Sequence, residues 1–161
     1  MLKLQIICIG KIKEEYFTNA VKEYQKRLNG GVQLNILELP EYRLCGDDIQ
    51  RTIEQEGKSI LPKMDGAYNI AMCIEGQMCT SEQLSQKIFE IAGNGYSKIN
   101  FIIGGSYGLS QQVKKSCQQA LSFSKLTFPH QLFRVMLAEQ LYRAVQIHTG
   151  SKYHKYWNML Y

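Results

Sequence analysis

Three stretches of this sequence carry residue types that could bind a ligand or move a proton, and all three lie after residue 100. The first is Gly104-Gly105-Ser106-Tyr107-Gly108-Leu109, which we call the glycine loop. It follows an apolar run and precedes a helical pattern, so we expect it at the carboxyl end of a sheet, where open α/β folds bind ligands. Glycines let a backbone approach a ligand closely. A tight turn without a ligand is the alternative.

The glycine loop does not match a dinucleotide-binding fingerprint. Its pattern is G-G-x-x-G rather than G-x-G-x-x-G, and no acidic residue follows at the distance of about 20 residues that would bind a ribose. An NAD-dependent oxidoreductase is therefore disfavoured.

The second stretch is residues 120–130, with the sequence ALSFSKLTFPH. Serine and threonine hydroxyls alternate there with apolar residues just before the expected start of a helix. Such a segment can bury its backbone in a cleft and offer amides and carbonyls to a planar heterocycle. The alternative is a short strand with one solvated face and a helix cap at Thr127.

The third stretch is the long C-terminal helix with the tail that follows it. Glu139 and Arg143 are four residues apart, so an intrahelical ion pair is one explanation of the two charges. Arg134 and Arg143 could instead contact phosphates. The imidazole of His154 can change its charge near neutral pH, although a histidine in a tail can equally be inert.

The charge of the chain is concentrated in this last region. The 161 residues carry a formal net charge of +5, and residues 121–161 hold five basic side chains against one acid, Glu139. All three histidines and eight aromatic residues lie there as well. A basic surface with interleaved aromatic rings fits an anionic partner whose bases can stack. A solvated basic surface is the alternative.

Five scattered cysteines without a C-x-x-C pair match neither a zinc site nor a disulfide framework. We expect reduced cysteines, a cytoplasmic location and no bound metal. No apolar run approaches the roughly 18 residues that span a bilayer, and the apolar residues 1–8 are too few for a signal peptide. We therefore expect a soluble protein with no membrane partner.

Strand and helix patterns alternate along the chain. Apolar runs predict strands over residues 2–9, 32–39, 68–74, 98–103 and 121–126. Periodic stretches predict helices over residues 14–28, 47–61, 81–92, 110–119 and 129–148, with caps from Asp47, from Thr80 or Ser81, and from Ser110. The alternation predicts one α/β domain over residues 1–161, with a mainly parallel sheet and helices on both faces.

The last of these helices is apolar on nearly every face. A helix of this kind is covered on two sides. In so small a domain we expect the second cover to be another copy of the chain, so the sequence predicts a homodimer.

The order and identity of these segments resemble the RlmH group of the SPOUT methyltransferases. The similar segments are residues 103–109, residues 121–134, the helix motif of residues 139–144, and Tyr153-His154-Lys155 in the tail, and the similarity extends over essentially the whole chain. One departure is the continuation over residues 156–161, where the family commonly stops. That extension could stack on RNA or pack on a partner subunit.

The resemblance implies a fold with a trefoil knot over about residues 100–155 and a homodimer with its active site at the subunit boundary. It implies transfer of a methyl group from S-adenosylmethionine to N3 of a pseudouridine in large-subunit (23S) ribosomal RNA, on assembled ribosomes. The cofactor-binding residues that it implies are Met72, where the family usually has leucine, and Gly104, Phe123, Ser124, Lys125, Leu126, Thr127 and Phe128.

Such a reaction needs the attacking nitrogen aligned with the methyl group and its imino proton removed. We expect His154 to accept or position that proton, with Tyr153 orienting or stacking the target base. Glu139, paired or not with Arg143, is the rival base, so the candidate catalytic residues are His154, Tyr153, Glu139 and Arg143. Arg134, Arg143 and Lys155 are expected to contact phosphates. The alternative function is a ribosome- or RNA-binding factor that keeps the fold without catalytic activity.

Overall fold

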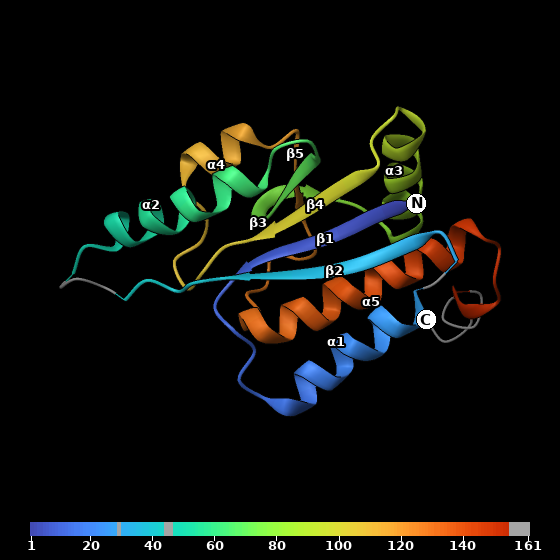
Figure 1. Cartoon of the computed structure of the whole chain (residues 1–161), viewed down its shortest axis with the longest axis horizontal. Helices are drawn as coiled ribbons and strands as arrows, with labels where there is room; N and C mark the ends of the chain where they lie inside the picture. The colour runs from blue at the N-terminus through green and yellow to red at the C-terminus, as the bar shows by residue number, and fades with distance from the viewer. Residues whose placement is uncertain (29, 44–46, 155–161) are drawn as a thin grey trace.

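The computed structural model describes residues 1–28, 30–43 and 47–154. A five-stranded sheet forms its centre, with the strand order β2-β1-β4-β3-β5 and parallel pairing between all neighbours (Figure 1). The strands are β1 (Leu2–Ile9), β2 (Val32–Leu39), β3 (Tyr68–Met78), β4 (Lys98–Ile103) and β5 (Gln119–Ser122). The helices are α1 (Glu15–Arg27), α2 (Ile49–Ile60), the short 3-10 helix η1 (Leu61–Lys63), α3 (Ser81–Gly93), α4 (Gln111–Ser116) and α5 (His130–His148). The predicted α/β class is confirmed.

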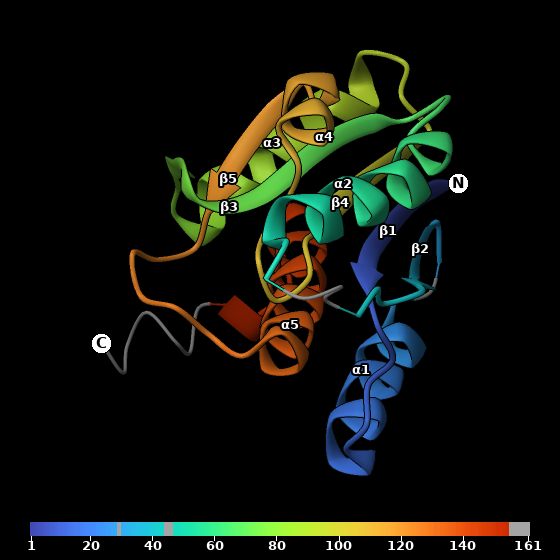
Figure 2. The ribbon, with the colours of Figure 1, turned by 90° about the vertical axis from the view of Figure 1, so that its left-hand side faces the viewer.

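Helices cover both faces of the sheet, as expected from the sequence (Figures 1 and 2). Helices α1, α3 and α5 pack on one face, and α2 and α4 pack on the other. Each face of the sheet carries its own apolar core, and strand β1 contributes side chains to both. Leu4 and Ile6 lie in the core beside α5, and Ile7 and Ile9 lie in the core beside α2. A strand buried on both faces has a continuous apolar sequence, which explains the run at the start of the chain.

Two of the three predicted capping positions are confirmed. Thr80 and Gln83 form a reciprocal capping box at the start of α3, and the Ser110 hydroxyl accepts from the Val113 amide at the start of α4. Helix α2 begins one residue later than predicted. Asp48 rather than Asp47 is the cap there, because the Asp48 carboxylate accepts from the amide three residues further on.

The sheet edge formed by β3 and β5 differs most from the prediction. Strand β3 continues to Met78, and its pairing with β5 shifts register between Met72 and Gln77. Strand β5 comes earlier and is shorter than predicted, so residues 123–128 form a loop instead of a strand. A Cβ on Gly76 would lie 2.5 Å from the carbonyl carbon of Leu121, so only glycine allows the two strands to approach this closely.

Helix α5 packs along the sheet between α1 and α3, with Pro129 at its N-cap position. Leu137, Leu141 and Ala144 are fully buried there, whereas Val135 and Met136 remain half-buried. Contacts within one chain therefore bury only part of the apolar surface of α5 and leave Val135 and Met136 partly exposed. The second copy of the chain and the trefoil knot stay predictions.

Among the described residues, no helix has the combination of length and apolarity needed to cross a bilayer. The same residues contain no group of three or more metal-binding side chains placed to share an ion.

Candidate functional site

The predicted cofactor-binding residues surround one pocket, which we call the loop pocket. The glycine loop after β4 and residues 121–128 meet there beside β3 and enclose about 360 Å³, a usual size for a small-ligand site. Seven of the eight predicted residues line it, namely Met72, Gly104, Phe123, Ser124, Leu126, Thr127 and Phe128. Lys125 is exposed and does not line the pocket. The fold thus brings together two stretches that the sequence keeps apart.

The glycine loop owes its shape to its own close packing. A Cβ on Gly104 would lie 2.4 Å from the carbonyl carbon of Gly108, so any side chain at Gly104 would push the loop open. The Gly108 amide donates to the Gly105 carbonyl over 3.1 Å, and Gly108 has a φ of 89°, which favours glycine. These glycines are needed to fold the loop, with or without a ligand.

Residues 122–128 are held by local hydrogen bonds and by aromatic rings. The Ser122 hydroxyl donates to the Ser124 carbonyl over 2.9 Å, and the Leu126 amide donates to the Ser124 hydroxyl over 3.0 Å. The rings of Phe123 and Phe128 both pack against Phe133 at the start of α5. The segment is therefore fixed on one side of the loop pocket before any ligand binds.

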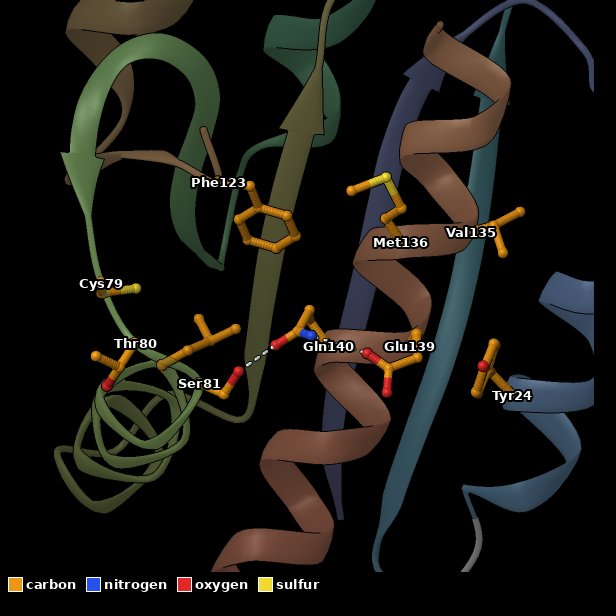
Figure 3. Close-up of a pocket in the computed structure, with 10 residues that line it drawn as sticks. Tyr24, Cys79, Thr80, Ser81, Phe123, Val135, Met136, Glu139 and Gln140 are labelled. Atoms are coloured by element: carbon orange, nitrogen blue, oxygen red, sulfur yellow. Dashed lines mark hydrogen bonds between the residues drawn. The ribbon is translucent and has the colours of Figure 1, made fainter. Parts of the chain in front are cut away.

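A second pocket of about 460 Å³ lies along α5, and we call it the α5 pocket (Figure 3). Glu139 and Gln140 of α5, Tyr24 of α1 and Ser81 at the start of α3 border it, and Phe123 lines both pockets. The Ser81 hydroxyl lies 2.7 Å from the Gln140 side-chain oxygen and donates to it. The α5 pocket therefore joins the cofactor side of the molecule to Glu139, one of the predicted catalytic residues.

The four predicted catalytic residues form one network at the end of α5. Glu139 accepts hydrogen bonds from Arg143 and, over 3.1 Å, from the Tyr153 hydroxyl. The guanidinium of Arg143 lies over the Tyr153 ring, 4.9 Å from its centre. Burial, and then the nearby Glu139 charge, raises the pKa of Tyr153 to about 12. The Tyr153 hydroxyl therefore stays protonated at neutral pH and donates a hydrogen bond to Glu139.

Both ring nitrogens of His154 have partners. Nδ1 lies 3.3 Å from Nη1 of Arg143, and Nε2 lies 2.7 Å from Oε1 of Glu82, whose pKa is lowered by this hydrogen bond. Arginine can only donate, so Nδ1 accepts and Nε2 carries the hydrogen that Glu82 receives. In this arrangement the Nδ1 lone pair of His154 is directed at Arg143.

None of these four residues is among those that line the loop pocket. Within one chain, the predicted catalytic network and the predicted cofactor pocket are separate features, bridged by Phe123 and the α5 pocket. The sequence alone did not indicate this separation.

Arg134 is not placed to contact phosphates. Its side chain is 2% exposed, and its guanidinium donates to the Ile9 carbonyl and pairs with Glu38 at 3.3 Å. These contacts tie the start of α5 to the carboxyl ends of β1 and β2, so Arg134 has a structural role. The reason is the orientation of α5, which turns this position inward. Lys155 and residues 156–161 lie outside the described residues.

Sequence reasoning missed one unusual group near the glycine loop. Glu56 on α2 is 5% exposed, and its carboxylate oxygens would be 2.4 and 2.8 Å from a Cβ on Gly105. A signal was available, because Thr52, Glu56 and Ile60 follow one another at helical spacing on the buried stripe of α2. An acid on such a stripe is exceptional.

Known proteins similar to this chain identify its family. A family profile described as "Predicted SPOUT methyltransferase" matches residues 2–154. The chain belongs to the SPOUT methyltransferase family. It is 45% identical over 160 residues to the ribosomal RNA large subunit methyltransferase H of Streptococcus uberis, and 46% identical over 156 residues to the protein of the same name in Fusobacterium nucleatum. Each alignment covers 96% of this chain and 100% of the relative.

Two solved structures share the fold of this chain. A probable methyltransferase from Bordetella pertussis Tohama I has a TM-score of 0.59 at 9% identity, covering 89% of this chain and 94% of that one. A probable methylase family protein from Haemophilus influenzae Rd KW20 has a TM-score of 0.55 and covers 93% of this chain and 69% of that one, at 11% identity. The resemblance seen in the sequence is confirmed, and this SPOUT protein is an S-adenosylmethionine-dependent methyltransferase.

Proposed function

We propose that this SPOUT methyltransferase methylates N3 of a pseudouridine in large-subunit ribosomal RNA, on assembled ribosomes, with S-adenosylmethionine in the loop pocket. One observation carries the cofactor site: the glycine loop and residues 123–128 enclose a single cavity of about 360 Å³. The substrate class is supported by the relatives, whose names give large-subunit ribosomal RNA as their target.

The residues of the loop pocket suit this cofactor. Met72, Phe123 and Phe128 offer apolar surfaces to an adenine ring, and Ser124 and Thr127 offer hydroxyls to its polar edges. S-adenosylmethionine carries no phosphate, so a P-loop lysine is not needed. When bound, its sulfonium group supplies an activated methyl group. The chain itself must then position the base and remove its proton.

His154 is the better candidate for the proton acceptor. Glu139 accepts from Arg143, Tyr153 and, over 2.8 Å, Gln140, so its lone pairs are already engaged. The Nδ1 lone pair of His154 faces only the 3.3 Å contact to Arg143 among the contacts described for it. A small movement of Arg143 toward an RNA phosphate would release that lone pair for the imino proton.

The same geometry supports a homodimer with a shared active site. The 153–154 turn of one chain does not line its own loop pocket, so we propose that it serves the loop pocket of a second copy. The half-buried Val135 and Met136 on α5 and the adjoining α5 pocket are the surface we assign to that copy. Tyr153 would then orient the target base and Arg143 would contact its phosphate.

We propose that two subunits and the ribosome itself together form the RNA-binding surface. We expect free RNA to be a poor substrate, binding to weaken steeply with salt, and the enzyme to work in the cytoplasm, where ribosomes are.

Two measurements test this function. Calorimetry with S-adenosylmethionine should show binding, whereas a factor that keeps only the fold would give no heat. Mass spectrometry of ribosomal RNA from a deletion strain should show one pseudouridine that lacks its N3 methyl group. Strong activity on a short naked hairpin would contradict the assignment to assembled ribosomes.

A further inference from the structure

Helix α2 supports the glycine loop from behind. A Cβ on Gly57 would lie 2.6 Å from the Ser110 hydroxyl, at one end of the loop. A Cβ on Gly105, near the other end, would lie 2.4 Å from Oε2 of Glu56. None of the residues lining the loop pocket comes from α2. Glu56 therefore packs against Gly105 of the loop without lining the pocket itself.

Among the described residues, the buried carboxylate of Glu56 has no ion-pair partner. The side chain is 5% exposed, and Oε2 has no hydrogen-bond partner in the described part of the chain. Burial, and then the charge of Glu41, raises the pKa of Glu56 to about 7. The elements packed against α2 contribute several other charged side chains, which are Glu38 on β2, Lys63 on η1, and Lys114 and Lys115 on α4. Lys114 is engaged with Glu75.

The wall of the loop pocket itself provides little net charge. Lys114 and Glu75 line it as an ion pair, and burial lowers the pKa of His130, which keeps that lining residue neutral. A buried carboxylate without a cation is costly, and a cation in the pocket that Gly105 lines would relieve part of that cost. The unpartnered negative charge of Glu56 therefore favours a positively charged ligand in the loop pocket.

We propose that Glu56, acting through the glycine loop, makes the loop pocket select the sulfonium form of the cofactor over its uncharged thioether product. S-adenosylmethionine carries one positive charge more than S-adenosylhomocysteine, and the two molecules otherwise differ by one methyl group. Glu56 does not touch the cofactor, so it is a specificity-determining residue and not a catalytic one. This inference rests on the cofactor site proposed above.

Calorimetric titration of both ligands tests the proposal. Dissociation constants are measured at pH 6 and pH 8 for the wild type, Glu56→Gln and the control Glu54→Gln, which changes an exposed acid on the same helix. In the wild type, the preference for S-adenosylmethionine should be about tenfold greater at pH 8, where Glu56 is ionised. In Glu56→Gln that gain should disappear. Because the ligand amine titrates equally in all variants, the comparison isolates Glu56.

The outcomes separate this inference from the proposed function. An unchanged preference and pH profile in Glu56→Gln, with both ligands bound, would overturn the role of Glu56 alone. Equal weakening of both ligands would also overturn it, because a loop support has no reason to distinguish their charges. If Glu56→Gln does not fold, a preference in the wild type that stays constant between pH 6 and pH 8 refutes the proposal. Failure of the wild type to bind either ligand would instead refute the cofactor site.

Discussion

Nη1 of Arg143 lies 3.3 Å from Nδ1 of His154, eleven residues further along the chain, where the turn after α5 folds back onto the helix. Arg143 also binds Glu139, and His154 also binds Glu82. The four side chains therefore form a chain of contacts in the order Glu139, Arg143, His154, Glu82. An RNA phosphate that attracted Arg143 would compete with this arrangement. We therefore expect RNA binding to be coupled to exposure of the His154 lone pair.

Replacing His154 with alanine tests its place in the proton transfer. We expect the single-turnover rate of methylation on purified ribosomes to fall by about 100-fold or more, the usual contribution of a positioned general base. The dissociation constant for S-adenosylmethionine should change much less than the rate, because the role proposed for His154 is toward the proton of the RNA base and not toward the cofactor. Glu82→Gln, which alters only the exposed partner of the imidazole, is the control and should cost far less. An undiminished rate in His154→Ala would remove this residue from the chemistry.

Arg134 should matter for stability rather than for RNA binding. Arg134→Met leaves the Ile9 carbonyl and Glu38 without their buried donor, so the free energy of unfolding should fall by about 3 kcal/mol. Arg27→Met removes the exposed ion pair with Glu23 and should cost far less stability than Arg134→Met. Urea denaturation measures both. If Arg134→Met were as stable as the wild type and its ribosome binding depended less on salt, Arg134 would instead have to contact an RNA phosphate.

The ionisation of Glu56 predicts a pH-dependent stability. Its pKa is raised to about 7, so the folded ligand-free protein holds a proton that the unfolded chain releases near pH 4.5. The resulting stability is fully present below about pH 4.5 and is lost as the pH rises through 7. Relative to the wild type, Glu56→Gln should therefore gain about 2–3 kcal/mol between pH 5 and pH 8 in urea denaturation. Glu54→Gln should show no gain in the free energy of unfolding relative to the wild type over this pH range. If Glu56→Gln also showed no gain, Glu56 would not be a buried ionisable group.

The close approach of β3 and β5 predicts a specific requirement for glycine. In Gly76→Ala the new Cβ would lie 2.5 Å from the Leu121 backbone, so we expect a loss of about 3 kcal/mol and weaker cofactor binding, because β5 leads directly into residues 123–128. Gly93→Ala is the control, because nothing lies within 4 Å of a Cβ there. As a helical position, it should be neutral or gain up to about 1 kcal/mol. Thermal unfolding of both variants checks the difference.

The sequence predicted the sheet and most helices because their signals are local. Apolar runs mark β1, β2 and β4, and Thr80 and Ser110 mark two helix starts. The long β3 and the early end of β5 escaped prediction, since a register shift across Gly76 depends on two distant strands. The side chain of Arg134 was misplaced for a similar reason. Whether a helical arginine faces solvent or the sheet is decided by tertiary packing.

The parts of the site that short sequence motifs form could be predicted. The parts where side chains from distant elements meet were harder to predict. Gly104 and Phe123 were identified as neighbours in function, and both line the loop pocket. Glu56 was missed, because its importance comes from Gly105, which lies 49 positions later in the chain. The separation of His154 from the loop pocket was missed because spacing along α5 says nothing about which pocket the tail reaches.

The central claim is that the glycine loop and residues 123–128 hold S-adenosylmethionine. A crystal structure of the protein with this cofactor tests it most directly. We predict electron density for the nucleoside between Gly104 and Phe128, with the 153–154 turn of a second copy facing the sulfonium group. Density for the cofactor in the α5 pocket, or at any other position on the chain, would contradict the account.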